Sequence, residues 1–167
     1  MNINIRKVEE QDLKQVAEIH VNGWKNAYKN LIDDDYLNSL SIENRLNKLK
    51  KNYNINGFLV ATLNDEIVGF IRYIFSNEFS SDYDVDCEVS ALYVKTSLKG
   101  NGIGTKLLNH VMDEFRKEDK KKMILWCLST NESSIHFYEK MGGKIIGQKE
   151  ELIGDKKYFE SGFEFVL

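Results

Sequence analysis

A strand-like run, a short glycine-bearing loop and a strongly amphipathic helix follow one another near the middle of the chain, and this succession constrains the fold most. Residues 85–94 form the strand-like run, and the loop at residues 99–104 comes shortly after it. Apolar residues then recur at helical spacing, namely Ile103, Leu107, Leu108, Val111, Met112 and Phe115. A second strand-like run occupies residues 123–128. Such a β-α-β succession predicts two parallel strands joined by a right-handed helical crossover.

The rest of the chain supplies the elements of a single α/β domain over residues 1–167. Strands are predicted at residues 2–8, 57–63, 67–75, 144–153 and 157–166, and helices at residues 13–28, 33–40, 42–52 and from 131 to the glycine pair at 142–143. No repeat or linker divides the chain. The simplest way to bury the apolar stripes is a mixed sheet with helices on both faces.

Composition and charge exclude several classes of protein. The formal net charge of −3 argues against a nucleic-acid partner. No window approaches the ~20 apolar residues of a membrane span, and the N-terminus lacks the apolar stretch of a secretory signal, so a cytoplasmic location is expected. Cys87 and Cys127 have no CxxC partner and are expected to be buried, reduced thiols. The histidines, His20, His110 and His136, lack metal-ligand spacing, so no metal site is expected.

The loop has the physical properties of a pyrophosphate cradle. Glycines let backbone amides approach a ligand, and the free N–H groups of the following helix carry the positive end of its dipole. A P-loop would need Gly-Lys-Ser/Thr, whereas Gly104 is followed by Thr105-Lys106. The dinucleotide fingerprint would need a third glycine at Thr105. Taken alone, the loop is also compatible with a turn that merely starts a helix.

Two motifs in register resemble those of the GNAT superfamily of acetyl-CoA-dependent N-acetyltransferases. The run Leu92-Tyr93-Val94-Lys95-Thr96-Ser97-Leu98-Lys99-Gly100-Asn101-Gly102-Ile103-Gly104-Thr105-Lys106-Leu107-Leu108 resembles the family's acetyl-CoA motif, with Lys99 where Gln or Arg is usual. The run Asn131-Glu132-Ser133-Ser134-Ile135-His136-Phe137-Tyr138-Glu139-Lys140-Met141-Gly142-Gly143 resembles the family's second signature. The order of elements matches over nearly the whole chain.

The resemblance implies the GNAT fold and a site for acetyl-CoA. The sheet is expected to splay between the strands at residues 85–94 and 123–128, with the pantetheine arm in the gap. The implied cofactor-binding residues are Leu92, Tyr93, Val94, Lys99, Gly100, Asn101, Gly102, Ile103, Gly104, Thr105, Asn131, Ser134 and Tyr138. The family position of Tyr138 places its hydroxyl near the thioester sulfur.

Acetyl transfer to an amine needs a base for the ammonium proton and an acid for the departing thiolate. Tyr138 is the predicted acid, because its place in the second motif matches that of the family's tyrosine. The alternative is that Tyr138 is a core aromatic residue beside Ile135 and Met141. Glu88 is the predicted base, because it is an acid within the otherwise apolar or small-residue strand before the loop. The alternative is that Glu88 is a charged residue at an exposed strand end and that water acts as the base.

The predicted acceptor is a small cationic, polyamine-like amine. Trp24 and Tyr28 lie at i and i+4 and could line its pocket or simply pack in the core. Asp33, Asp34 and Asp35 could hold its ammonium groups or serve only as helix caps, and a second acidic set lies at residues 82–86. Peptide N-termini and a non-catalytic acyl-CoA-binding module remain alternatives, and GNAT proteins are often homodimers.

Overall fold

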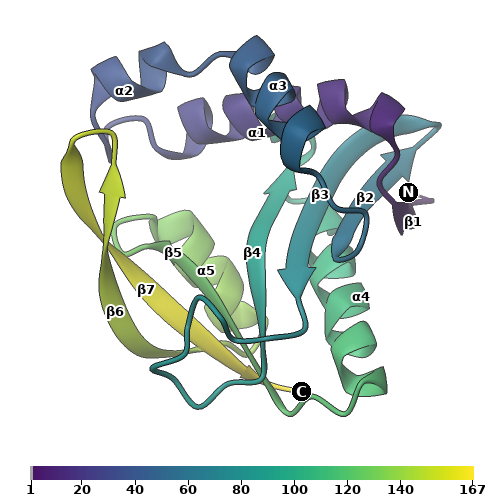
Figure 1. Ribbon diagram of the computed structural model, residues 1–167, viewed down its shortest axis with the longest axis vertical. Helices are drawn as coiled ribbons and strands as arrows, with labels where there is room; N and C mark the ends of the chain where they lie inside the picture. The colour runs from purple at the N-terminus through teal and green to yellow at the C-terminus, as the bar shows by residue number, and fades with distance from the viewer. Residues whose placement is uncertain (1) are drawn as a thin grey trace.

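A single seven-stranded sheet organises the computed structural model, which describes residues 2–167 (Figure 1). The strand order is β1-β2-β3-β4-β5-β7-β6. The strands are β1 (Asn4–Lys7), β2 (Phe58–Leu63), β3 (Glu66–Ile74), β4 (Cys87–Val94), β5 (Lys122–Leu128), β6 (Lys144–Ile153) and β7 (Lys156–Val166). The helices are α1 (Leu13–Ala27), α2 (Asp34–Ser39), α3 (Ile42–Asn52), α4 (Ile103–Lys117) and α5 (Glu132–Lys140). Each predicted element is therefore present, with ends shifted by a few residues.

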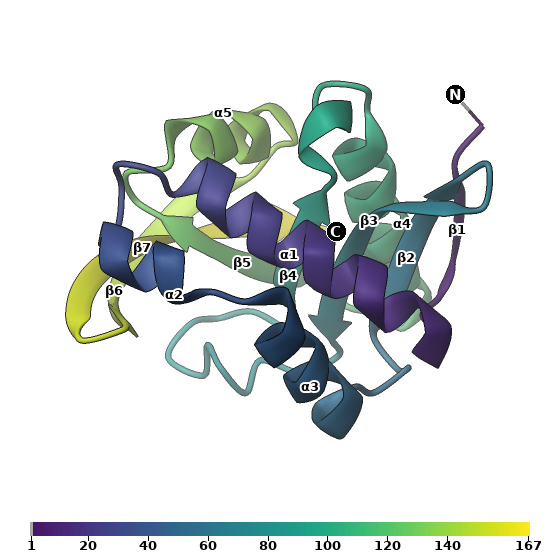
Figure 2. The same cartoon turned by 90° about the horizontal axis from the view of Figure 1, so that it is seen from above.

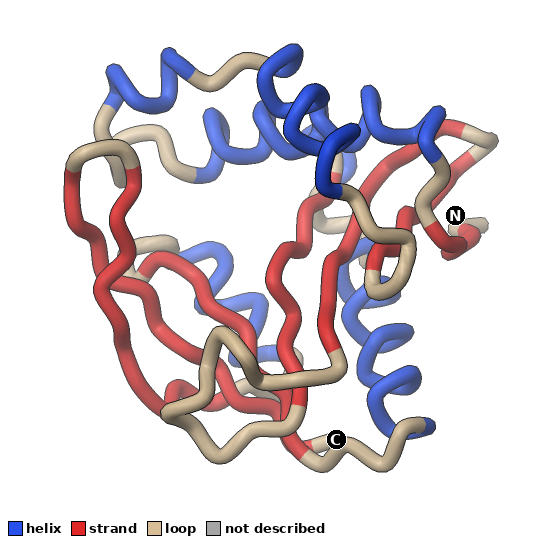
Figure 3. Tube along the Cα trace, in the orientation of Figure 1, coloured by secondary structure: helices blue, strands red, loops and turns tan. Residues whose placement is uncertain are grey.

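The sheet divides between β4 and β5, the one parallel pair in it. The two strands pair only at Cys87 with Met123, Glu88 with Ile124 and Val89 with Leu125. Beyond Val89, β4 continues beside β3 as far as Val94, whereas β5 continues beside β7 as far as Leu128. Figure 3 shows the two strands diverging upward from this short contact. The predicted splay is thus present.

Helices cover both faces of the sheet, and each face has its own core. Helices α4 and α5 pack on one face around Leu107, Phe115, Tyr138 and Phe163. Helices α1 and α3 pack on the other face, against side chains of β2 and β3 such as Phe70. Seen from above, α1 crosses between α3 on one side and the pair α4 and α5 on the other (Figure 2). Both cysteines are buried and free, as predicted.

The segment from α1 to α2 spans the open end of the divided sheet. Trp24, Tyr28 and Tyr36 from this segment pack with Leu128 of β5 and Ile153 of β6 in a third apolar cluster. The α1 helix also contacts β3 and β4, so this segment links the two halves of the sheet. None of the helices in residues 2–167 has the length and apolarity needed to cross a membrane.

Candidate active site

The gap between the diverging strands is lined on one side by the free end of β4. Residues 91–94 are only half-buried, although they lie near the middle of the sheet. A bulge at Ser90 separates Ala91, which pairs with Arg72, from Val89, which pairs with Tyr73. After the bulge, Tyr93 packs toward α1, and Leu92 and Val94 pack toward α4. Backbone groups of this segment are therefore accessible to a ligand between the two half-sheets.

The glycine loop beside this strand end presents unpartnered amides. Gly100 and Gly102 have φ angles of +83° and +77°, which other residues rarely adopt, and a Cβ at either would meet no atom within 4 Å. Gly102 is the N-cap of α4, and the first amide that donates into the helix is that of Lys106, to the Gly102 carbonyl at 3.0 Å. The amides before it are free to bind anionic oxygens, and the helix dipole adds to their attraction.

The other loop residues shape this surface. The Asn101 side chain donates to the carbonyl of Leu98 at 3.1 Å, which holds the loop closed. The Lys99 side chain is exposed and makes no ion pair with a residue in 2–167. Gly104 lies against α5, since a Cβ there would be 3.5 Å from the Phe137 ring. The two helices that carry the two motifs therefore meet beside the gap.

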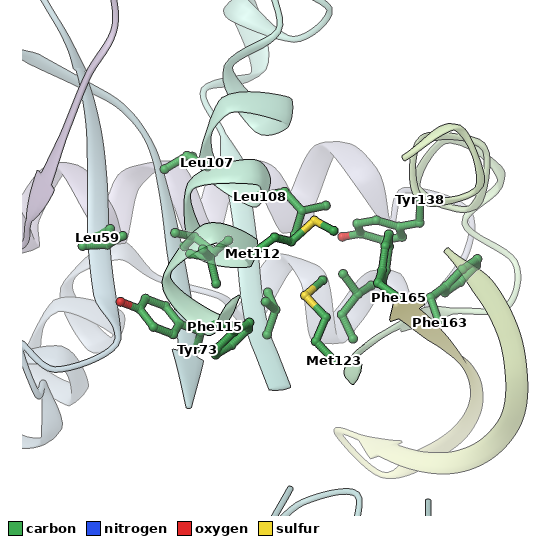
Figure 4. Close-up of a cluster of buried hydrophobic side chains, with 14 of the residues drawn as sticks. Leu59, Tyr73, Leu107, Leu108, Met112, Phe115, Met123, Tyr138, Phe163 and Phe165 are labelled. Atoms are coloured by element: carbon green, nitrogen blue, oxygen red, sulfur yellow. The ribbon is translucent and has the colours of Figure 1, made fainter. Parts of the chain in front are cut away.

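Tyr138 projects from α5 into the core on the α4 face. It is buried, with its ring 5.5 Å from that of Phe163, and Figure 4 shows its hydroxyl directed toward the side of Leu108 and Met112. Burial raises the pKa of this hydroxyl well above its ordinary value, and no hydrogen bond offsets the effect. Cys127 of β5 and Tyr93 of β4 are close enough to add to the rise. The hydroxyl is consequently near both β4 and β5, on the α4 face of the sheet.

Asn131 and Ser134 start the helix that carries Tyr138. Asn131 is the N-cap of α5, and its side-chain oxygen accepts the Ser134 amide at 3.2 Å. The helix ends where Gly142 takes a φ of +95°, as the glycine pair predicts. The structure thus uses the Asn131 oxygen in capping, which fixes the position of α5 beside the gap.

Glu88 lies at the closed end of the gap, where β4 and β5 still pair. The carboxylate is buried: it accepts the Phe79 amide at 3.1 Å and lies beside the Ser80 hydroxyl, which itself accepts the Trp126 indole N–H at 3.0 Å. Only 3% of the residue is exposed, so it is no surface residue at a strand end. Burial is the largest cause of a raised pKa at Glu88.

Glu160 on β7 is a second carboxylate of this region, which the sequence analysis did not identify. It pairs across the strands with Leu128, and its side chain is 20% exposed, with Lys149 Nζ at 3.7 Å. Burial raises its pKa as well. The same ammonium lies 4.5 Å above the Trp126 ring and acts electrostatically on Glu88. No motif marks Glu160 in the sequence, because its position depends on the register of β7 against β5.

An aromatic group closes the gap on the α1 side. The Trp24 indole N–H donates to the Tyr93 hydroxyl at 2.7 Å, and the Tyr28 side chain approaches the same hydroxyl. The rings of Trp24 and Tyr28 meet edge to face at 4.8 Å between centroids. Both predicted residues therefore reach the end of β4, and both also pack in the third apolar cluster.

The predicted acidic residues serve as caps, form ion pairs or lie exposed. Asp33 caps α2 by accepting the Tyr36 amide at 3.1 Å and forms an ion pair with Lys156 of β7. Asp34 and Asp35 are exposed on the first turn of α2. Within the second acidic set, Asp86 accepts the amides of Lys121 and Lys122. The structure accordingly gives Asp33 and Asp86 structural partners and does not gather these acids around the gap.

Comparison with known proteins identifies relatives of this arrangement. The family model described as the acetyltransferase (GNAT) family matches residues 24–143. A spermidine N(1)-acetyltransferase from Thermoplasma acidophilum is 31% identical over 172 residues, which cover 95% of this chain and 99% of that protein. The uncharacterized N-acetyltransferase YuaI from Bacillus subtilis is 24% identical over 91% of this chain and 87% of its own length.

A solved structure resembles the whole chain. The crystal structure of the PaiA N-acetyltransferase from Thermoplasma acidophilum, in complex with coenzyme A, superposes with a TM-score of 0.73 at 25% identity. The alignment covers 99% of this chain and 100% of that protein. The divided sheet and the glycine loop therefore occur in a fold that is known to hold coenzyme A.

Proposed function

This chain belongs to the GNAT family of acetyltransferases, and from that premise we propose that it acetylates a primary amine of a small cationic, polyamine-like acceptor. It is an acetyl-CoA-dependent N-acetyltransferase. The observation that carries the proposal is the divided sheet, with free amides at its open end and, on its α1 side, the buried carboxylate of Glu88 and the half-buried one of Glu160.

The glycine loop fits the pyrophosphate of acetyl-CoA. The space beside Gly100 and Gly102 is free of other protein atoms, so phosphate oxygens can reach the amides of residues 100–105. The half-buried backbone of Leu92 and Val94 would pair with the amide groups of the pantetheine arm. When bound, the cofactor supplies an activated acetyl thioester; the side chains around the gap must handle the protons.

Glu88 is the proposed base for the ammonium proton of the acceptor. A carboxylate with a raised pKa accepts a proton more readily than an ordinary one does. The Ser80 hydroxyl beside it and the Trp126 indole hold its position. Because Glu88 lies at the closed end of the gap, the proton would reach it through water from the amine near Tyr93.

Tyr138 is the proposed acid for the departing thiolate. Its hydroxyl is protonated at neutral pH, as a tyrosine ordinarily is, and burial raises its pKa further. A thiol has an ordinary pKa near ~8.5, so the thiolate that leaves is basic enough to need stabilisation. A hydroxyl near both β4 and β5 can provide a hydrogen bond or a proton to a thiolate in the gap.

The acceptor would enter from the side of α1, α2 and β7. Trp24 and Tyr28 offer an aromatic wall for an alkyl chain or an ammonium group. Glu160, rather than Asp33 to Asp35, supplies the carboxylate that would attract a second ammonium group. The spermidine N(1)-acetyltransferase relative supports this class of acceptor.

Acetyl-CoA consumption measured with a panel of amines tests the proposal. We expect turnover with putrescine, spermidine or other small aliphatic polyamines, with a KM that rises steeply with salt because charge holds the acceptor. Replacing Glu160 with Gln should raise that KM, whereas Asp34→Asn, an exposed acid on α2, should leave it unchanged. Turnover confined to peptide N-termini, or no turnover with any amine, would exclude this acceptor class.

A further inference from the structure

A pocket of about 310 Å³ opens between α1, α2 and the first turns of α3, next to the aromatic group of the acceptor side. Trp24 and Tyr36 form its apolar part, and His20, Asn44, Arg45 and Lys48 form its polar part. No aspartate or glutamate lines it. The pocket therefore combines an aromatic wall with basic side chains, in a protein whose net charge is negative.

Arg45 is the unusual member of this pocket. Its Nε is buried and has no hydrogen-bond partner among residues 2–167. Two of the other three arginines have acidic partners: Arg6 contacts Asp12 at 2.6 Å, and Arg116 contacts Asp113 at 2.7 Å. An arginine stays protonated even when it is partly buried, so Arg45 presents an uncompensated charge and an unused hydrogen-bond fork.

The surroundings of Arg45 add positive potential. The guanidinium of Arg72 on β3 is near enough to repel that of Arg45, and it lies over the Phe58 ring at 5.2 Å without an acidic partner. The Nδ1 atom of His20 is buried and also unpartnered. The N-cap of α3, Ser41, lines the same pocket, so the positive end of the helix dipole lies there too.

We propose that this pocket binds a carboxylate carried by the acceptor itself, with Arg45 as its main ligand. The inference rests on the proposed amine acetylation and changes the preferred acceptor: among small cationic amines, it is an amino acid-like one, which has an anionic group as well as the amine to be acetylated. A planar guanidinium fork matches a carboxylate, and a charge-assisted pair would satisfy the donors that the protein leaves unpaired.

The position of the pocket favours an acceptor over an unrelated ligand. His20 stacks beside Tyr93 at 4.7 Å between ring centroids, and Trp24 donates to the Tyr93 hydroxyl. Tyr93 belongs to the strand end that borders the gap. The Arg45 guanidinium is also near enough to the Tyr93 hydroxyl to act on it electrostatically. The pocket therefore adjoins the strand end where the amine would react, and one small molecule could place its carboxylate at Arg45 and its amine beside Tyr93.

Two pairs of amines that differ by one carboxylate test this proposal: ornithine with putrescine, and lysine with cadaverine. We expect kcat/KM for the amino acid to exceed that for the matching diamine by roughly 10- to 100-fold, the range of a charge-assisted hydrogen bond. Arg45→Met should abolish this preference, mainly by lowering kcat/KM for the amino acid. Lys51→Met removes one charge from the exposed part of α3 outside the pocket and should keep the preference.

A second measurement covers the case in which Arg45→Met fails to fold. Arg45→Lys keeps the charge and loses the fork, and it should reduce the preference several-fold at an unchanged melting temperature. A preference for the diamines in the parent enzyme, or a preference for amino acids that survives Arg45→Met, would overturn the inference and leave amine acetylation intact. Failure of all four amines would count against the proposed acceptor class.

Discussion

Burial raises the pKa of Tyr138, Glu88 and Glu160, the side chains proposed to handle protons or charge, and the same shift has opposite consequences for an acid and a base. Tyr138 becomes a weaker acid and holds its proton across the working pH range. Glu88 and Glu160 become stronger bases. Lys149 near both carboxylates limits their rise. The raised pKa therefore favours proton acceptance at the two carboxylates, and at Tyr138 it favours a hydrogen bond to the thiolate over complete proton transfer.

Replacing Tyr138 with Phe keeps the buried ring and removes the hydroxyl. We expect kcat to fall by roughly 10²-fold, a typical loss for a general acid, while the affinity for acetyl-CoA stays nearly the same. The hydroxyl has no protein partner that the change would leave unsatisfied, so the melting temperature should hold. Steady-state kinetics and isothermal titration with coenzyme A measure the two quantities. An unchanged kcat would exclude Tyr138 as the acid.

Replacing Glu88 with Gln removes the proposed base and keeps its size. A base works only when it is deprotonated, so kcat/KM of the parent should fall as the pH drops below the pKa of Glu88, which burial places above the ordinary carboxyl range. In Glu88→Gln this acid limb should disappear, and kcat/KM at neutral pH should be lower by roughly 10²-fold. Glu160→Gln is the matched comparison: if its profile loses the acid limb instead, Glu160 is the base.

At the scale of elements, the glycine loop can present amides to a ligand because it joins the end of β4, at Val94, to the start of α4, at Ile103. Positive φ angles at Gly100 and Gly102 turn the chain so that α4 starts beside the free end of β4. The α4 side chains Leu107 and Phe115 are buried against the sheet and hold the helix there. Packing on one side of the helix thus fixes the position of the free amides at its N-terminus.

A bulky residue at Gly102 should block the approach of a phosphate to these amides. Gly102→Leu also imposes a side chain on a φ of +77°, which costs about 1–2 kcal/mol of stability. Gly142→Leu at the end of α5 is a matched control, because Gly142 has a φ of +95° and the same open surroundings. We expect both variants to melt lower and only Gly102→Leu to lose the stabilisation by acetyl-CoA in thermal shift assays. Equal stabilisation in both would show that the loop does not hold the cofactor.

The fold could be predicted from the sequence because its signals are local. The apolar period of α4, the strand run before it and the glycines at 142–143 each depend on neighbouring residues. The acceptor side could not be predicted in this way. Arg45 and Tyr93 are 48 positions apart in the sequence, and their proximity depends on how α3 packs on the sheet. The acidic residues 33–35 form a conspicuous pattern, yet Asp33 is used as a helix cap.

At the scale of the whole molecule, two half-sheets are joined by little backbone pairing. Three residue pairs connect β4 and β5, while β5 and β7 share seven and β3 and β4 share six. The α1 to α2 segment and the shared core on the α4 face supply the remaining connections. A ligand between β4 and β5 would add contacts to both halves, so ligand binding and the stability of the whole sheet are coupled.

Acetyl-CoA should therefore stabilise the entire molecule. A ligand that binds only the folded state at 100 times its Kd adds about 2.7 kcal/mol to the free energy of unfolding. For a chain of this size that corresponds to a rise in melting temperature of roughly 5–10 °C. Differential scanning fluorimetry with millimolar acetyl-CoA measures the rise, and desulfo-type analogues that retain the pyrophosphate but lack the thioester separate the contribution of the loop.

Hydrogen exchange locates the same effect in the structure. We expect acetyl-CoA to slow exchange most at residues 90–94 of β4 and at residues 100–105, because the amides there that lack a protein partner would gain one. The amides of β2, which pairs with β1 and β3 on both edges, serve as an internal reference and should change little. A melting temperature that millimolar acetyl-CoA leaves unchanged, with no added protection in either segment, would contradict the assignment of the gap as the cofactor site.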